Sequence, residues 1–286
     1  MPKMNIPKSS TKENSIADKA LKSQGTVNIP KYFFKFISNN SMHFHSSMHE
    51  LLTHNKIYLS SRIEFNDPFD CAIYIAEINK DQVDKYLDEA LNRFNLSRKI
   101  KNEWVNISKC PIKFREALAA SLNQQLDKQG IYSLSASIKN PLMWAHYANS
   151  HQGIAIVYNH NRNDEKFNPL PICYQKQYEE NPNSFIDLDY LFIKGEEWRY
   201  EKEWRIIKKI KAKEFVELPE NVINGIILGA KCDESTSLFL KDLIKSRALE
   251  GRPPITLYRA DINDKFFQLD FYEEIDGQYN LINIFD

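Results

Sequence analysis

The stretch Trp198-Arg199-Tyr200-Glu201-Lys202-Glu203-Trp204-Arg205-Ile206-Ile207 decides the fold and contains the main candidate for a functional site. Its alternation of residue types predicts a β-strand in which Glu201, Glu203 and Arg205 point to one face. Two carboxylates and a guanidinium are costly to bury without partners, so this face lies against solvent or a polar cleft. The flanking tryptophans indicate partial burial, and we therefore predict a cleft with a working carboxylate on this strand.

Other segments with strand character lie on both sides of this stretch. They are residues 31–38, 56–60, 131–135, 154–158, 172–174, 190–193, 215–218, 222–228 and 255–258, followed by a hairpin over 265–284 around Asp276-Gly277. Helices are predicted at 47–54, after Asn140-Pro141, and at 235–249 behind the capping candidate Asp233. The mixture predicts an α+β fold, with a mixed, mainly antiparallel, curved or split sheet flanked by helices.

Residues 80–130 interrupt the strand pattern. Apolar residues recur there at three- and four-residue steps, as in Val83, Tyr86 and Ala90, and a second stripe over 114–122 ends before Gly130. We interpret this region as a helical insertion in a single domain over 31–286. Residues 1–30 are rich in Lys, Ser and Asn without periodicity, which predicts a flexible tail.

Composition restricts the partners of the protein. The 286-residue chain has 38 basic and 38 acidic side chains, so its overall charge gives no reason to expect a membrane or nucleic-acid partner. The four cysteines are scattered, and no run of eighteen apolar residues occurs. These features predict a soluble cytoplasmic protein with reduced thiols.

Three other local patterns leave two interpretations open. His45 and His49 are four residues apart on a predicted helix, as zinc ligands can be, but ordinary surface histidines are favoured and we predict no metal site. Asn66 and Asp67 either cap a turn before Pro68 or present polar groups to a ligand. The N-terminus of the helix that begins at Asn140-Pro141 is a candidate anion-binding site. His146 on this helix either faces the core or belongs to the site.

The ordered motifs together resemble bacterial domain-of-unknown-function family 2971. The resemblance spans roughly residues 32–259 and rests on the aromatic run around Lys35 and on several further motifs. These are Asn66-Asp67-Pro68-Phe69-Asp70, Ser135, Met143-Trp144-Ala145-His146-Tyr147-Ala148, His151-Gln152-Gly153 and the segment from Trp198 to Arg205.

The family's layout in turn is similar to the ADP-ribosyltransferase arrangement, in which three strand-borne elements follow in order. That resemblance implies Lys35 as the first element, although histidine or arginine is usual there, Ser135 as the second, and Glu201 or Glu203 as the third. It also implies NAD as substrate. A fixed carboxylate would stabilise the positive charge that develops on the ribose when the bond to nicotinamide breaks.

The same resemblance implies residues that would bind NAD. Arg205 would hold a phosphate, and aromatic side chains would stack on a base, with polar groups beside them. These candidates are Tyr58, Asn66, Asp67, Trp144, His146 and Tyr147. In the competing interpretation, the two glutamates form ion pairs with neighbouring basic residues on a sheet surface.

Three hypotheses about function follow. The first is an NAD-consuming, ADP-ribosyltransferase-like enzyme, a toxin or anti-phage effector that modifies nucleic acid or protein and is held by an antitoxin-like partner. The second is a non-catalytic module that binds a nucleotide or partner. The third is a metal-dependent nuclease built on Asp67, Asp70, Glu201 and Glu203.

Overall fold

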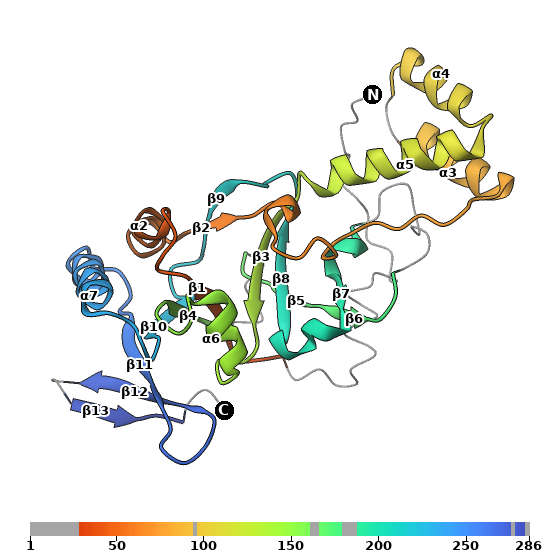
Figure 1. Cartoon of the computed structure of the whole chain (residues 1–286). Helices are drawn as coiled ribbons and strands as arrows, with labels where there is room; N and C mark the ends of the chain where they lie inside the picture. Colours follow the sequence, from red (N-terminus) through yellow and green to blue (C-terminus); the bar gives the residue numbers. More distant parts are fainter. Residues whose placement is uncertain (1–28, 94–95, 161–165, 179–187, 276–277, 284–286) are drawn as a thin grey trace.

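We describe the fold from a computed structural model of the chain, which defines residues 29–93, 96–160, 166–178, 188–275 and 278–283. Most of the predicted tail, and the turn predicted at 276–277, lie outside the described residues. In the described part, nine strands form one open sheet (Figure 1). In spatial order they are β13 (Gln278–Leu281), β12 (Leu269–Ile275), β11 (Thr256–Ile262), β10 (Ile223–Leu228), β4 (Ile154–Asn159), β1 (Tyr32–Ile37), β3 (Gly130–Ser135), β8 (Glu203–Lys208) and β5 (Leu170–Pro171).

Most neighbouring strands in this sheet are antiparallel, and β10 with β11 is parallel. Strand β1 pairs with β4 over its whole length, and β3 does the same with β8. Between these two halves, the described residues register β1 against β3 at the pair Phe34–Ser135. Two small sheets, β2 (Lys56–Leu59) with β9 (Glu214–Glu217) and β6 (Cys173–Gln175) with β7 (Ile193–Gly195), lie outside the large one. The predicted α+β class with a mainly antiparallel sheet is confirmed.

Helices cover both faces of the sheet. Helices α2 (Phe44–His54) and α7 (Glu234–Leu249) pack against the face that carries Phe33, Leu134 and Ile156, and α6 (Pro141–Tyr147) packs against the face that carries Phe34 and Ala155. Helix α6 begins as predicted, since Asn140 caps it by accepting a hydrogen bond from the Leu142 amide. None of the described helices has the length and apolar character that crossing a membrane requires.

The insertion predicted at 80–130 consists of helices α3 (Lys80–Arg93), α4 (Arg98–Ile107) and α5 (Pro111–Leu126). They project from one end of the sheet (Figure 1). Trp104, Phe114 and Leu118 are among the buried residues of a hydrophobic cluster that belongs to these helices. The last helix ends at Leu126, and Gly130 is the first residue of β3.

Two predicted strands differ from the structure. Only the second half of the 198–207 stretch is a strand, because Glu196–Glu201 form a 3-10 helix, η3, and β8 begins at Glu203. Between them Lys202 adopts a left-handed conformation with φ 46°. The predicted strand at 190–193 is mostly the 3-10 helix η2 (Asp189–Phe192), which leads into β7.

Candidate functional site

Five charged side chains meet in the interior on the β3–β8 half of the sheet, and we call them the ion cluster: Asp70, Lys194, Glu201, Glu203 and Arg205. Each is buried, with at most 8% of its surface exposed. They come from the turn after the short helix η1 (Arg62–Glu64), from β7, from the end of η3 and from β8. Buried charges are stable when they are paired, and each of these five side chains contacts an oppositely charged one.

Lys194 links the three carboxylates. Its Nζ lies 2.5 Å from Glu201 Oε2, 3.0 Å from Glu203 Oε2 and 3.5 Å from Asp70 Oδ2. The same ammonium lies 5.1 Å from the ring centroid of Trp198. Lys194 therefore supplies positive charge to all three acids and contacts an aromatic ring as well.

Arg205 fixes the other side of the ion cluster. Its Nε donates to Glu203 Oε1 at 2.6 Å, and its Nη2 donates to Asp70 Oδ2 at 2.7 Å. Its Nη1 donates to the backbone oxygen of Leu191 at 2.8 Å and lies 2.9 Å from Cys71 Sγ. This fully buried guanidinium has hydrogen-bond partners at all three nitrogens, which positions Glu203 and Asp70 rigidly.

The two glutamates have opposite pKa shifts. Burial raises the pKa of Glu201, with Glu203 adding to the rise and Lys194 opposing it. For Glu203 burial acts in the same direction, but Arg205 and Lys194 lower its pKa to about 2. Three acids share two cations in direct contact. Glu201 is the acid that does not contact Arg205, and it therefore takes up a proton more readily. Opposite shifts in adjacent carboxyl groups are typical of acid–base sites.

The backbone explains how two glutamates on different elements reach one lysine. The left-handed Lys202 ends η3 and starts β8, so Glu201 and Glu203 flank a sharp bend. The amide of Glu203 donates to the hydroxyl of Tyr174 at 2.7 Å, so this backbone group is satisfied by a side chain. The bend thus replaces the continuous strand that the sequence predicted and still gathers the two acids.

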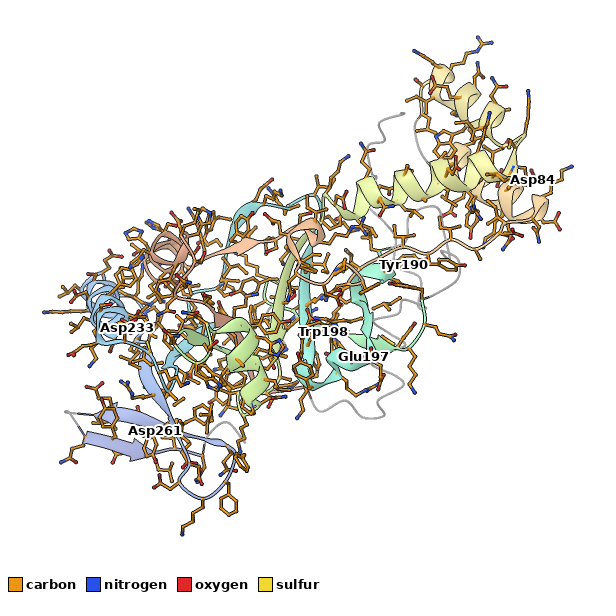
Figure 2. All side chains as sticks on the ribbon, in the orientation of Figure 1. Asp84, Tyr190, Glu197, Trp198, Asp233 and Asp261 are labelled. Atoms are coloured by element: carbon orange, nitrogen blue, oxygen red, sulfur yellow. The ribbon has the colours of Figure 1, made fainter. Side chains whose placement is uncertain are left out.

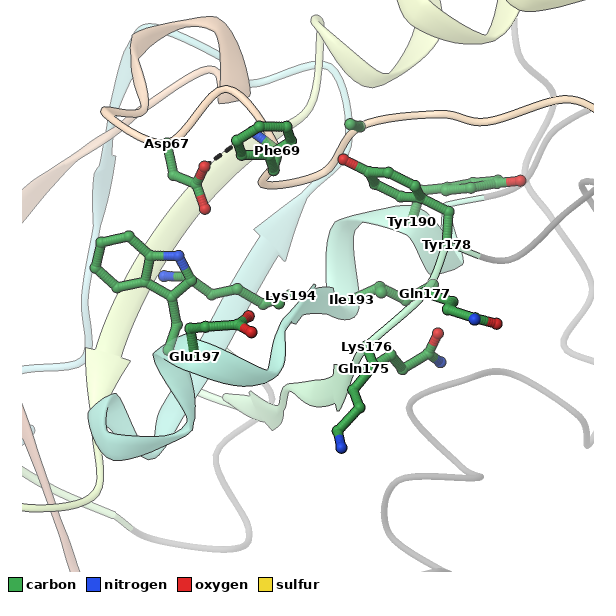
Figure 3. A pocket seen from close by; sticks show the side chains of 13 residues that line it. Asp67, Phe69, Gln175, Lys176, Gln177, Tyr178, Tyr190, Ile193, Lys194 and Glu197 are labelled. Atoms are coloured by element: carbon green, nitrogen blue, oxygen red, sulfur yellow. Dashed lines mark hydrogen bonds between the residues drawn. The ribbon is translucent and has the colours of Figure 1, made fainter.

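A pocket of about 280 Å³ lies beside the ion cluster. Lys194 belongs to both, and Trp198 supplies an aromatic wall. Figure 3 shows Tyr190 and Tyr178, which also line the pocket. Its remaining lining residues are Asp67, Phe69, Ala72, Gln175, Lys176, Gln177, Ile193, Gly195 and Glu197. Figure 2 shows Tyr190, Glu197 and Trp198 beside the central strands, far from Asp84 in the helical insertion. Aromatic walls with a few polar groups are the usual lining of a small-molecule pocket.

An aromatic group borders Glu201 on its other side. The Tyr147 hydroxyl donates to Glu201 Oε1 at 2.5 Å. The exposed His146 ring lies 6.2 Å from Tyr200 and 6.4 Å from Trp198, measured between ring centroids. Glu201 therefore lies between Lys194 and partly exposed aromatic residues, two of which, His146 and Tyr147, were predicted to belong to the site.

Ser135 and Glu203 lie side by side, because they are register partners on β3 and β8. The Ser135 hydroxyl, however, lies 2.7 Å from the backbone oxygen of Glu201 and 2.9 Å from that of Ser137, and its single hydrogen is donated to these two acceptors. It also accepts a hydrogen bond from the Ser137 amide. Ser135 thus holds the bend that carries Glu201.

Lys35 lies on the opposite face of the sheet. Phe34, Ser135 and Glu203 are successive register partners and share one face, so the neighbouring Lys35 points the other way. Its Nζ lies 4.8 Å from the ring centroid of Tyr132, and within the described residues it forms no ion pair. Burial lowers the pKa of Lys35 to about 8 against the opposing effect of Glu203 and Glu201. The structure therefore does not place Lys35 with Ser135 and the glutamates.

The remaining predicted ligand-binding residues occupy different positions. Tyr58 lies in the small β2–β9 sheet and donates to Glu64. Asn66 is exposed, and Asp67 lines the pocket while its Oδ1 caps the turn at the Phe69 amide. Trp144 is fully buried in the core and donates to the Ile138 backbone oxygen. Of these four, the structure brings only Asp67 to the pocket.

Lys194 was missed by sequence analysis, and Asp70 was considered only as a metal ligand. Lys194 is the one charged residue in the run Leu191-Phe192-Ile193-Lys194-Gly195. A charge inside an apolar strand is a signal of a buried partner, which could have identified it. Its ammonium contacts Asp70, Glu201 and Glu203, three of the four acids proposed for the nuclease, so their carboxylates already bind a protein cation. This arrangement does not favour the metal-dependent nuclease.

Comparison with known proteins shows a similarity over part of the chain. Residues 143–206 match the family described as "Protein of unknown function (DUF2971)". The resemblance noted in the sequence is thereby confirmed over a stretch that includes Tyr147, Lys194, Glu201, Glu203 and Arg205. No curated protein and no solved structure matches the chain.

Proposed function

We propose that the ion cluster and the adjoining pocket form the active site of an enzyme that cleaves NAD and transfers its ADP-ribosyl group to an acceptor. The observation that carries this proposal is the pair of buried glutamates with opposite pKa shifts beside an aromatic-lined pocket. Glu203 stays ionised, whereas Glu201 exchanges a proton more readily.

Each residue has a distinct role in this proposal. The nicotinamide–ribose bond breaks, nicotinamide leaves with the bonding electron pair, and positive charge develops at the ribose carbon. The carboxylates stabilise that charge. A hydroxyl or amine of the acceptor then bonds to this carbon while ionised Glu201 takes its proton, and Tyr147 holds the Glu201 carboxylate in place.

The pocket would bind the planar ring of the substrate. Trp198 and Tyr178 offer ring faces, and the polar groups of Asp67 and Gln177 lie among the lining residues. Lys194 replaces Lys35 as the cation of the site in this proposal, because Lys194, unlike Lys35, contacts both glutamates. Arg205 acts as a positioning residue, since its nitrogens are already engaged by protein groups.

The acceptor we propose is a nucleic acid or a protein, and the setting is the cytoplasm, where NAD is available and the four unpaired cysteines stay reduced. A bacterial toxin or phage-defence effector, restrained by an antitoxin-like partner, fits such an activity. Expression in bacteria should then slow growth, and Glu201→Gln should relieve the effect.

Incubation with labelled NAD tests the activity directly. We expect nicotinamide release and labelling of protein, DNA or RNA in a cell extract, lost in Glu201→Gln. The matched control is Glu196→Gln in the same 3-10 helix, because Glu196 pairs with Arg199 at the surface. No release by a folded wild-type protein with any acceptor contradicts the proposal.

A non-catalytic binding module is the second candidate. It is favoured by the fact that every carboxylate of the ion cluster already contacts a protein cation. In that case NAD or another nucleotide should raise the melting temperature without being consumed. Trp198→Ala should abolish that stabilisation, because the ring lines the pocket.

A further inference from the structure

A second group of potential ligands lies at the end of helix α2, on a different part of the molecule. His49, Glu50 and His54 each offer a ligand atom, and these atoms all lie within 4.8 Å of one another. The two histidines are exposed and Glu50 is half-buried. None of the three belongs to the ion cluster or lines the pocket described above.

The end of the helix explains why these side chains gather. His54 is the last residue of α2, and Asn55 follows in the left-handed conformation with φ 52°. The chain therefore turns at His54, and its ring comes to lie 5.6 Å from that of His49, measured between centroids. Glu50 approaches from the adjacent position, and within the described part of the chain its ion pair is a long 3.9 Å contact to Lys56. Such a contact at an exposed site is weak.

The backbone under this group is held firmly. Arg247 of α7 is buried and donates to the Leu52 backbone oxygen at 2.9 Å and to the Asn55 side chain at 2.7 Å. These bonds fix the last turn of α2 against α7. Three side chains on a fixed turn lose less conformational freedom on binding an ion than the same side chains on a mobile loop.

We propose that His49, Glu50 and His54 bind a zinc ion. Two imidazole nitrogens and one carboxylate oxygen are a common zinc donor set, and three protein ligands leave a fourth position for water or a ligand from a partner. Donor atoms around tetrahedral zinc lie about 3.3 Å apart. Rotation of exposed side chains, which is fast, closes the remaining gap.

His45 provides a matched control on the same helix. The sequence suggested pairing it with His49, but its ring packs against Phe239 at 4.6 Å, measured between centroids, and it is not part of the group. The structure thus replaces the His45–His49 pair with His49–His54 and adds Glu50 as the third ligand.

Zinc titration of the full chain against a chromophoric chelator tests the proposal. We expect one site, weakened at least tenfold in His49→Ala and in His54→Ala, severalfold in Glu50→Gln, and unchanged in His45→Ala. Cobalt(II) in place of zinc should give the absorption of tetrahedral nitrogen and oxygen coordination without a thiolate band. Affinity should fall on acidification, because protons compete for the imidazoles.

Two results overturn the proposal. One is a wild-type chain that binds no zinc at 100-fold excess of the ion over protein. The other is equal binding by wild type and the His49→Ala/His54→Ala double variant, which would assign the zinc to the cysteines or to other groups. Because the test needs no NAD and no acceptor, its outcome is independent of the proposed enzymatic activity.

Discussion

The ammonium of Lys194 lies 2.5 Å from a carboxylate oxygen of Glu201, and both side chains are buried. Neither charge can be left alone there, because an unpaired ion in a protein interior has lost its hydration without compensation. The ion cluster is thus a unit in which each member depends on the others. The same five residues are therefore needed for stability and include Glu201, the residue proposed to take the proton of the acceptor.

Replacing Lys194 by methionine should destabilise the protein strongly. The variant keeps most of the length of the side chain. Among the described residues it leaves Glu201 without a contacting cation, while Arg205 still contacts Asp70 and Glu203. We expect the free energy of unfolding to fall by about 3–5 kcal/mol, measured by urea denaturation.

The control for this change is Lys176→Met, at the exposed end of the neighbouring small sheet. It should change stability by less than about 0.5 kcal/mol. The double variant Lys194→Met/Glu201→Gln should recover part of the loss, because it removes one of the uncompensated carboxylates. Equal stability of Lys194→Met and wild type would show that the ion cluster is hydrated.

Stability should depend on pH through both glutamates, in opposite directions. The pKa of Glu203 is lowered from 4.5 to about 2, so its contribution is present above pH 4.5 and is lost as pH falls toward 2. The pKa of Glu201 is raised, so its folded state binds the proton more tightly and stability decreases as pH rises from 4.5 through the raised pKa.

Urea denaturation from pH 2 to pH 8 separates these two effects. Glu203→Gln should show a shallower loss of stability below pH 4.5, and the full shift of Glu203 corresponds to about 3 kcal/mol. Glu201→Gln should show a shallower decrease above that pH. If Glu201→Gln instead makes the loss of stability below pH 4.5 shallower, and Glu203→Gln the decrease above it, the two pKa shifts belong to the opposite glutamates.

Local signals in the sequence identified much of the fold. Alternation located β3, a continuous apolar run located β4, and Asn140-Pro141 correctly marked the start of α6, because strand faces and helix caps depend on residues close in sequence. The bend at Lys202 was not predictable in this way. A left-handed residue is usually signalled by glycine or asparagine, and here it is a lysine.

The candidate site was predictable only in part. The acids and Arg205 were recognised because several charges on one short aromatic stretch are unusual. The contacts of Lys194 with Asp70 depend on how η2 and β7 pack against the turn at Asp70, which no local pattern encodes. Likewise, the two-residue period of a strand correctly places Lys35 and Phe34 on opposite faces of the sheet. The register of β1 with β3 is needed to show that Lys35 faces away from Glu203.

Removing the Tyr147 hydroxyl should raise the pKa of Glu201 further. This hydroxyl donates to the carboxylate at 2.5 Å and so favours its ionised form. Carboxyl NMR titration of Tyr147→Phe should therefore show an upward shift of the Glu201 pKa relative to wild type. Tyr200→Phe is the control, because the Tyr200 ring lies beside His146, as the Tyr147 ring does, without a described hydrogen bond to Glu201. Equal titration of all three proteins would exclude Tyr147 as the group that holds Glu201.

The alkylation rates of the four cysteine thiols should show whether the ion cluster opens. Cys71 and Cys232 are buried, whereas Cys110 and Cys173 are half-exposed. Burial raises the pKa of the Cys71 thiol, although Arg205 opposes the rise, and burial raises that of Cys232 to about 11. Alkylation followed by mass spectrometry should therefore label Cys110 and Cys173 first in the native protein.

The variant Lys194→Met then makes this labelling specific for the ion cluster. Cys71 contacts Arg205 and Asp70, so loosening of the charges should expose it to the reagent. Cys232 packs in the core near α7 and should stay protected in the same variant. Faster labelling of Cys71 alone would identify local opening of the ion cluster. Equal acceleration at Cys71 and Cys232 would instead indicate global unfolding, since only that exposes both thiols together.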